Sequence, residues 1–189
     1  MNVHYLHYGV AVVTENVASA GDVCPNTPRA DGSPPAPCIL GSGGGVAIRI
    51  GYRSRGPWYV GGAYEFSRQD ASNLMTLPIL QQLRAETRYY FDAGRRLTPY
   101  VSAGLGAALY GNEWSAVTGG VTGFLGAGLE FQLSESLVLG PAAAYRPFLL
   151  RSWTDGAGQR RADGYLGFGL SHLIALEVVL EIRDPLSRW

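Results

Sequence analysis

The residues that could perform catalytic or phosphate chemistry are few and poorly placed. Ser171 and His172 form the only adjacent serine–histidine pair. Neighbours on a strand point to opposite faces, so they cannot form a nucleophile–base contact. His4 and His7 also fall on opposite faces and form no metal site. The glycine-rich run 41–45 leads into a strand and is not followed by lysine, unlike a phosphate-binding loop. We therefore expect no enzyme activity, no metal and no cofactor.

The two cysteines, Cys24 and Cys38, bracket a proline-rich segment. A pair that staples so short a loop is typical of a disulfide in an oxidising compartment. In the chain-entropy model, closing a loop of about 15 residues stabilises the fold by roughly 3 kcal/mol. Two free thiols are the alternative. Metal binding is disfavoured, because two isolated cysteines without a nearby histidine cannot fill a tetrahedral site.

Charged residues are sparse and balanced, with 15 basic residues, all of them arginine, and 15 acidic residues. No basic excess attracts nucleic acid, so we expect no such partner. Buried charges must be paired to be tolerated. We hypothesise a paired ionic network that fills a lumen, formed by charged residues that share one face of the expected strands: Glu15, Arg49, Arg53, Glu65, Arg84, Glu86, Arg88, Glu130, Arg146, Glu177 and Glu181.

A period-two alternation that runs along almost the whole chain would position these side chains. It is clearest from Leu166 to Ile182, where every second residue is apolar except His172 and the residues between are mostly small or charged. A strand separates two such sets onto opposite faces, whereas a helix would mix them. The sequence contains no run of roughly 18 apolar residues, so it predicts no transmembrane helix. Eight stretches predict eight strands: around 4–15, 45–53, 58–68, 79–91, 99–110, 120–132, 137–151 and 166–182.

The connections between these stretches alternate in length. The expected long ones are 16–44, 68–78, 111–119 and 152–164, and the short ones are 54–57, 92–96 and 134–136. Long loops at one end and tight turns with both termini at the other are typical of outer-membrane barrels. The stretch 137–151 is the weakest, because Pro141 and Pro147 should sit near a rim or a bulge.

Alternation also fits a soluble lipocalin-like barrel, in which the apolar face points inward around an apolar ligand. Here the other face is mostly Gly, Ala and Ser with a few charges, which suits a narrow interior better than a soluble surface. We therefore predict that the apolar face points outward, and keep the soluble barrel as an alternative. Aromatic residues near strand ends are candidates for interfacial girdles: Trp58, Phe66, Tyr89, Phe91, Tyr110, Phe131 and Trp153.

With this pattern the chain resembles the small outer-membrane barrels of OmpA/OmpX type, including porin-like outer-membrane β-barrel proteins. The resemblance implies an all-β, eight-stranded antiparallel up-and-down transmembrane barrel over residues 1–183, located in a bacterial outer membrane. Trp189 is similar to the C-terminal aromatic that the assembly machinery reads in that family, although Pro185 and Ser187 break the expected alternation. Residues 184–189 are then a periplasmic tail or the end of the last strand. The first residues show no signal peptide, so we expect a mature chain without its leader.

The expected role is structural or surface recognition, with outer-membrane lipid and lipopolysaccharide as partners. Residues 17–43 form the expected long, disulfide-closed extracellular loop, and this loop or the barrel exterior is where a protein partner would bind. Arg160 and Arg161 are candidates for contact with lipopolysaccharide phosphates. A narrow porin-like channel for small solutes is the alternative, since eight strands leave an interior just wide enough for side chains.

Overall fold

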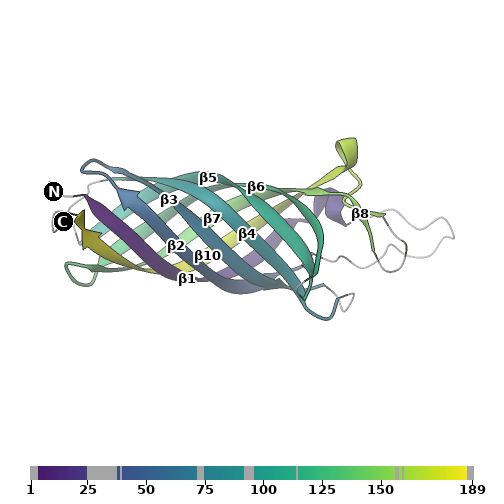
Figure 1. Cartoon of the computed structure of the whole chain (residues 1–189), viewed down its shortest axis with the longest axis horizontal. Coiled ribbons are helices and arrows are strands. Elements are labelled where there is room, and N and C mark those ends of the chain that lie inside the picture. The colour runs from purple at the N-terminus through teal and green to yellow at the C-terminus, as the bar shows by residue number, and fades with distance from the viewer. Residues whose placement is uncertain are drawn as a thin grey trace.

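Eight antiparallel strands form a closed barrel in the computed structural model (Figure 1). Each strand pairs with its neighbour in sequence, and the last pairs with the first, which confirms the predicted up-and-down barrel. The structure describes residues 4–24, 38, 40–71, 75–91, 96–113, 115–155, 158 and 160–186. The barrel strands are β1 (Tyr5–Ser19), β2 (Gly43–Arg53), β3 (Trp58–Gln69), β4 (Pro78–Tyr90), β5 (Leu97–Asn112), β6 (Ser115–Gln132), β7 (Leu137–Arg151) and β10 (Phe168–Pro185).

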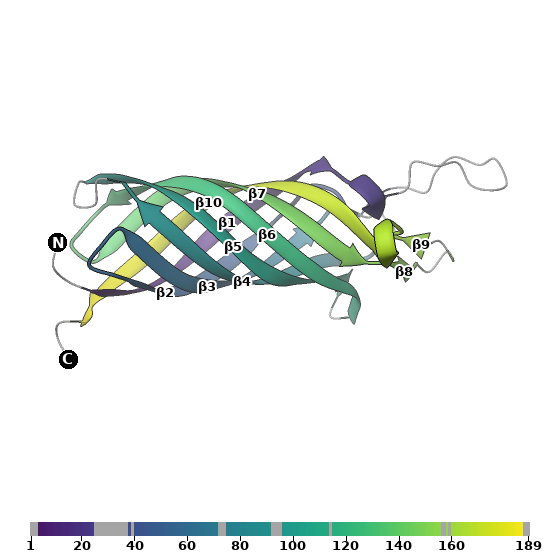
Figure 2. The same cartoon turned by 90° about the horizontal axis from the view of Figure 1, so that it is seen from above.

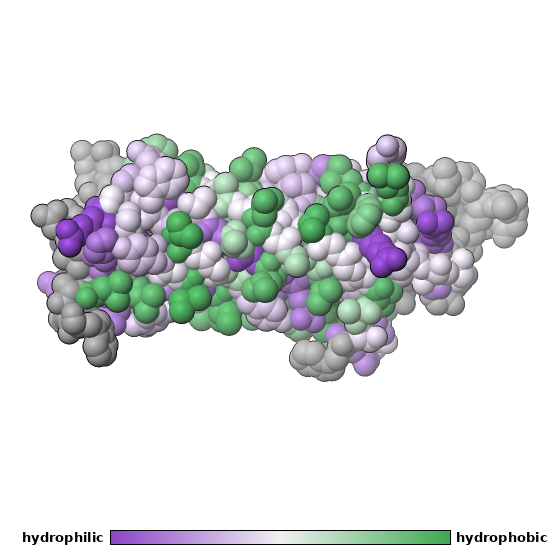
Figure 3. All heavy atoms as spheres, turned by 45° about the horizontal axis from the view of Figure 1, so that its top comes forward, coloured by the Kyte–Doolittle hydropathy of each residue, from purple (hydrophilic) through white to green (hydrophobic). Residues whose placement is uncertain are grey.

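The alternation of the sequence becomes the two faces of the barrel wall. On β10 the even-numbered residues from Phe168 to Ile182 face outward. The odd-numbered residues between them, from Gly169 to Arg183, face inward. The other strands follow the same rule, so large apolar side chains are exposed along the wall. Figure 3 shows them spread over the visible face between the two ends. The prediction that the apolar face points outward is confirmed.

The small elements gather at one end of the barrel, which we call the loop end (Figure 2). They are η1 (Gly21–Val23), the hairpin of β8 (Trp153–Thr154) with β9 (Arg160–Arg161), and η2 (Tyr165–Gly167). At the opposite turn end, the backbone N–H of Leu186 donates to the carbonyl of His4 at 2.9 Å. Among the described residues, no helix is long and apolar enough to cross a membrane.

The fifth connection is not the long loop expected at 111–119. The pairing of β5 with β6 continues to Asn112 and Ser115, with a register shift after Tyr110. Glu113 has a φ of 55° in the turn that follows β5. The stretch 115–119 therefore extends the hairpin as part of β6, and Asn112 pairs directly with Ser115.

The prolines of β7 lie within a continuous strand, without the bulge or rim that the sequence suggested. Pairing with β10 is unbroken across both, at Pro141↔Val178 and Pro147↔His172. The backbone N–H of a strand residue points toward only one neighbouring strand. A proline, which has no N–H, therefore loses a hydrogen bond to one neighbour and leaves the pairing with the other intact. The interruptions fall opposite β6, where pairing skips residues 123–124 and 129–130.

The last strand runs past Arg183. Tyr5 pairs with Pro185, so 184 and 185 belong to β10 instead of a separate tail. Ser187 and Trp189, on which the assembly signal depends, lie outside the described residues.

Candidate functional site

The interior of the barrel is a charged lumen. The structure places all eleven charged residues of the hypothesised network inside it, where every one of them is buried. It adds Arg183, whose odd number continues the inward series of Glu177 and Glu181 on β10. Six arginines and six glutamates then face one another, so their formal charges cancel. Two groups of contacts can be distinguished along the barrel axis.

The loop-side cluster is centred on Arg146 of β7. Its Nη1 donates to Oε1 of Glu15 at 2.9 Å and to Oε1 of Glu65 at 2.7 Å, and its Nη2 contacts Glu177. Arg84 donates to the other oxygen of Glu65 at 2.9 Å. These partners come from β1, β3, β4 and β10, so one cluster ties together five strands. Uncharged donors complete the carboxylate shells: Ser67, Gln69 and Gln82.

The turn-side cluster is centred on Arg88 of β4. Its Nη2 donates to Glu86 at 2.8 Å, and its Nη1 lies 2.7 Å from Glu181 and 3.7 Å from Glu130. His7 Nδ1 lies 3.4 Å from Glu181. Glu130 also pairs with two further arginines, Arg53 and Arg183.

One carboxylate joins the two clusters. Glu177 contacts Arg146 of the loop-side cluster and also Arg49, which lies 3.8 Å from Glu86 of the turn-side cluster. The ion pairs therefore form a continuous chain along the lumen. In a low-dielectric interior such pairing is what makes buried charge tolerable, because an unpaired charge there is strongly unfavourable.

Tyrosines fill the space beside the turn-side arginines. The guanidinium of Arg53 lies 3.8 Å from the ring centre of Tyr90, and that of Arg88 lies 4.6 Å from the ring centre of Tyr59. The N–H groups of a guanidinium lie in its plane, so its flat face forms no hydrogen bonds. Stacking on an aromatic ring gives that face a favourable cation–π contact. The hydroxyl of Tyr90 donates to Glu130 at 2.6 Å.

Glycines make room for these rings. A Cβ at Gly51 or Gly61 would lie 2.3 Å from the nearest atom of the Tyr59 side chain, and one at Gly128 would lie 2.5 Å from Tyr100. Small residues on the inward face thus leave space for long ones, as a narrow barrel requires. A void of about 10 Å³ beside Arg88 and Tyr100 is near the smallest that holds one water.

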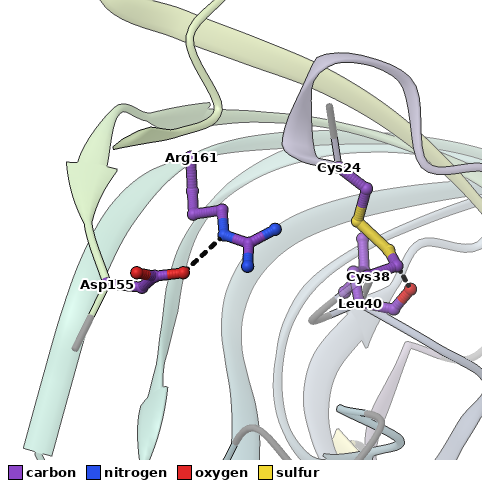
Figure 4. The surroundings of a disulfide bond; sticks show 5 residues. All are labelled: Cys24, Cys38, Leu40, Asp155 and Arg161. Atoms are coloured by element: carbon purple, nitrogen blue, oxygen red, sulfur yellow. Dashed lines mark hydrogen bonds and ion pairs between the residues drawn. A yellow bond between two sulfur atoms is a disulfide. The ribbon is translucent and has the colours of Figure 1, made fainter. Parts of the chain in front are cut away.

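An apolar cluster packs inside the barrel at the loop end, and we call it the loop-end cap. It joins the small elements to the inner wall through Val23, Cys24, Leu40, Leu80, Ala108, Tyr110, Phe148, Leu150, Trp153, Ala162 and Leu173. The predicted disulfide between Cys24 and Cys38 is confirmed, with 5.0 Å between the Cα atoms, and both cysteines pack on this cap (Figure 4).

Two of the aromatic residues expected in outer girdles lie in this cap instead. Tyr110 and Trp153 are buried, with ring centres 6.5 Å apart. Tyr110 shares the parity of Tyr100 and Ala108, which are also buried, so its position in β5 dictates the inward direction. At the turn end, Trp58, Tyr89 and Phe91 do form an outer aromatic row.

The adjacent Arg160 and Arg161 face different surroundings. Arg161 is 1% exposed and its Nε donates to Asp155 at 2.8 Å (Figure 4). The side chain of Arg160 is 60% exposed and pairs with Asp163 at 3.1 Å. Neighbours on a strand point to opposite sides, so contact with an external phosphate through both arginines is not available in this arrangement.

Ser171 and His172 are not brought together. Ser171 is buried in the wall's inner face, whereas His172 faces outward, stacks on Tyr145 and forms a hydrogen bond with its hydroxyl. In the part of the chain that the structure describes, no group of three His, Cys, Asp or Glu residues is arranged to hold a metal.

A closed eight-stranded barrel with an apolar exterior and a charged interior defines the outer-membrane barrel class of fold. Solved structures agree: AlkL, an outer-membrane protein determined in lipid bilayers, matches with a TM-score of 0.62 and 16% identity over 98% of this chain and 92% of that one. OprG of Pseudomonas aeruginosa matches with a TM-score of 0.54 and 12% identity, covering 97% of each chain. Neisserial surface protein A matches with a TM-score of 0.53 and 16% identity, covering 95% of each.

At these identities the likeness establishes the fold. No family model matches the sequence. No curated protein matches it significantly.

Proposed function

We propose that this chain is a bacterial outer-membrane protein whose barrel is sealed and whose loop end serves a structural or surface-recognition role, without catalysis. The observation that supports the proposal is the packing of the lumen in two layers. The Arg146-centred cluster spans the interior, and the loop-end cap lies over it. A barrel filled in this way is a rigid support for loops more than a conduit.

The placement in a membrane is supported by the distribution of polarity. Leu105 and Leu125, in the middle of the wall, are more than 60% exposed, while Arg84 and Arg146 are buried. This distribution is the reverse of that in a water-soluble protein. It suits a lipid bilayer, because outer-membrane barrels typically carry an outward apolar band about 25 Å tall. A transmembrane strand needs only about 10 residues, so β10, with 18, extends beyond a membrane.

The recognition role is supported by the way the loop end is fixed. The disulfide and the cap attach the first connection to the inner wall, and β8–β9 is attached through Trp153 and Ala162. Most of the first loop, 25–37 and 39, lies outside the described residues. A protein partner would therefore bind a loop whose two ends are fixed to the rigid barrel.

Conductance in planar lipid bilayers tests the seal against the narrow-channel alternative. We expect the refolded protein to give no discrete channel steps above background. R146A should introduce leakage, because it opens the loop-side cluster, whereas R160A, on an exposed side chain, should leave the membrane as tight as before. Steps of uniform size from the unmodified protein would contradict the sealed lumen and establish the channel.

A further inference from the structure

One sector of the loop end, where β7 passes into η2 and β10, carries exposed residues that neither the lumen nor the loop-end cap uses. We call it the rim site and define it by Arg151, Arg160, Tyr165 and Leu166. Three contacts hold it together. Arg151 pairs in register with Phe168, the backbone N–H of Ser152 donates to the carbonyl of Gly167 at 2.8 Å, and Arg160 Nη2 lies 3.4 Å from Ser152 Oγ.

The apolar half of the rim site is the η2 turn. Tyr165 is 85% exposed and Leu166 is 80% exposed, the highest fractions among the large apolar side chains described. Leu166 also has a φ of 55°, a left-handed conformation that leucine rarely adopts. Figure 1 shows this turn standing out sideways from the barrel wall at the loop end. Exposing two large apolar side chains to water in a strained turn is unfavourable. The pair therefore indicates that this turn contacts an apolar environment.

The position of the turn indicates which environment that is. Phe168 and Leu170, the first outward residues of β10, follow it directly and begin the row that faces lipid. The sideways projection brings the η2 turn over the same surroundings, instead of along the axis where another cell or protein would approach. Tyrosine with its polar tip is suited to the boundary between headgroups and acyl chains.

The basic half of the rim site is a pair of arginines. Arg151 is exposed on the outward face of β7, and its guanidinium has no ion-pair partner among the described residues. Among the described residues, Arg160 forms an ion pair only with Asp163, and both side chains are at least half exposed. An ion pair in that setting is weak, so a doubly charged phosphate can replace it. Asp22, whose carboxylate lies beside Gly164 just before the turn, accepts from the backbone N–H of Leu170 at 3.4 Å.

We propose that the rim site binds a phosphorylated lipid of the outer leaflet, with Arg151 and Arg160 on the headgroup phosphate and Tyr165 and Leu166 among the upper acyl chains. This inference rests on the proposed placement in the outer membrane. It replaces the pair Arg160–Arg161 suggested by the sequence, because Arg161 is turned inward to Asp155.

Binding of a fluorescent bis-phosphorylated lipid A to the purified barrel in dodecylmaltoside micelles tests the proposal. R151Q/R160Q should weaken the apparent affinity about tenfold, since two charge-assisted phosphate contacts are lost. The matched control R55Q/R68Q removes the same charge from two exposed arginines elsewhere and should change it less than about twofold. Leu166→Gly should also weaken binding, although glycine relieves the strain of the turn.

Equal weakening by both double variants would overturn the proposal, because it would indicate a nonspecific charge effect. Displacement of the lipid by millimolar inorganic phosphate would assign the site to free phosphate instead. Heat-modifiable gel mobility of each variant shows whether its barrel is folded. A wild-type protein that stays soluble without detergent would contradict the proposed function itself, whatever its affinity for lipid A.

Discussion

Arg146 Nη1 donates to Glu65 Oε1 at 2.7 Å across the full width of the lumen. Arg146 is on β7 and Glu65 is on β3, and these strands are four positions apart in the ring of eight, directly opposite each other. The same nitrogen also reaches Glu15 at 2.9 Å on β1. The contact is therefore a brace between walls that share no backbone hydrogen bond.

Truncating the brace should destabilise the barrel strongly. In R146A, Glu15 and Glu65 lose their shared counterion while buried, which costs about 3–5 kcal/mol. Urea unfolding in detergent, followed by gel mobility, measures the loss. R160A, which removes an exposed ion pair, should cost less than about 1 kcal/mol. Equal losses in the two variants would show that the brace contributes nothing specific.

The contributions of Arg146 and Glu65 to stability should not be additive. Removing Glu65 as well, in R146M/E65Q, should cost less than the sum of the single changes by about 1–3 kcal/mol, because one uncompensated carboxylate is then gone. A double-mutant cycle on the same unfolding assay gives this coupling energy. Strict additivity would argue that the residues do not interact.

Much of this arrangement follows from counting residues along the strands. Once β10 is known to be a strand, Glu177, Glu181 and Arg183 must point the same way, and Leu176, Leu180 and Ile182 must point the other way. The placement of these charges on one shared face was thus predictable from the sequence, and the small Gly, Ala and Ser residues beside them indicated that this face points inward. The parity of Tyr110 would also have placed it inside.

Other features depend on geometry that parity does not contain. Which arginine meets which glutamate depends on strand stagger around the ring, which brings Arg146 of β7 to Glu65 of β3. The hairpin of β5 and β6 depends on the left-handed residue Glu113 closing a turn. The inward direction of Arg161 depends on the packing of β8 and β9 onto the cap, outside the regular wall.

The inward glycines should be intolerant of a single methyl group. In G61A the new Cβ would lie 2.3 Å from Tyr59 Oη and 2.5 Å from the carbonyl oxygen of Ile50, which is backbone and cannot move away cheaply. We expect a loss of about 1–3 kcal/mol, as for other overpacked sites. Its neighbour Gly62 points the other way, and a Cβ there meets nothing closer than 3.5 Å. G62A should therefore stay within about 0.5 kcal/mol of the original stability.

The disulfide should stabilise the loop end by restricting the unfolded chain. C24S/C38S opens a loop whose ends are 14 residues apart, and the chain-entropy model gives a loss of about 3 kcal/mol. Unfolding with and without dithiothreitol measures it. The reductant should shift the original protein by the same amount and leave the double variant unchanged. A shift of the double variant by the reductant would exclude the disulfide as the cause.

The central claim, an apolar exterior in contact with lipid around a charged interior, is tested most directly by quenching a fluorophore on the wall. Bimane on a cysteine replacing Leu105, which is 75% exposed in the middle of β5, is measured in lipid vesicles. The same label replacing Glu135, in the turn between β6 and β7, is the reference. The barrel described here predicts quenching at 105 by brominated lipid and not by iodide, with the reverse at 135. Quenching at 105 by iodide alone would place that face in water and contradict the account.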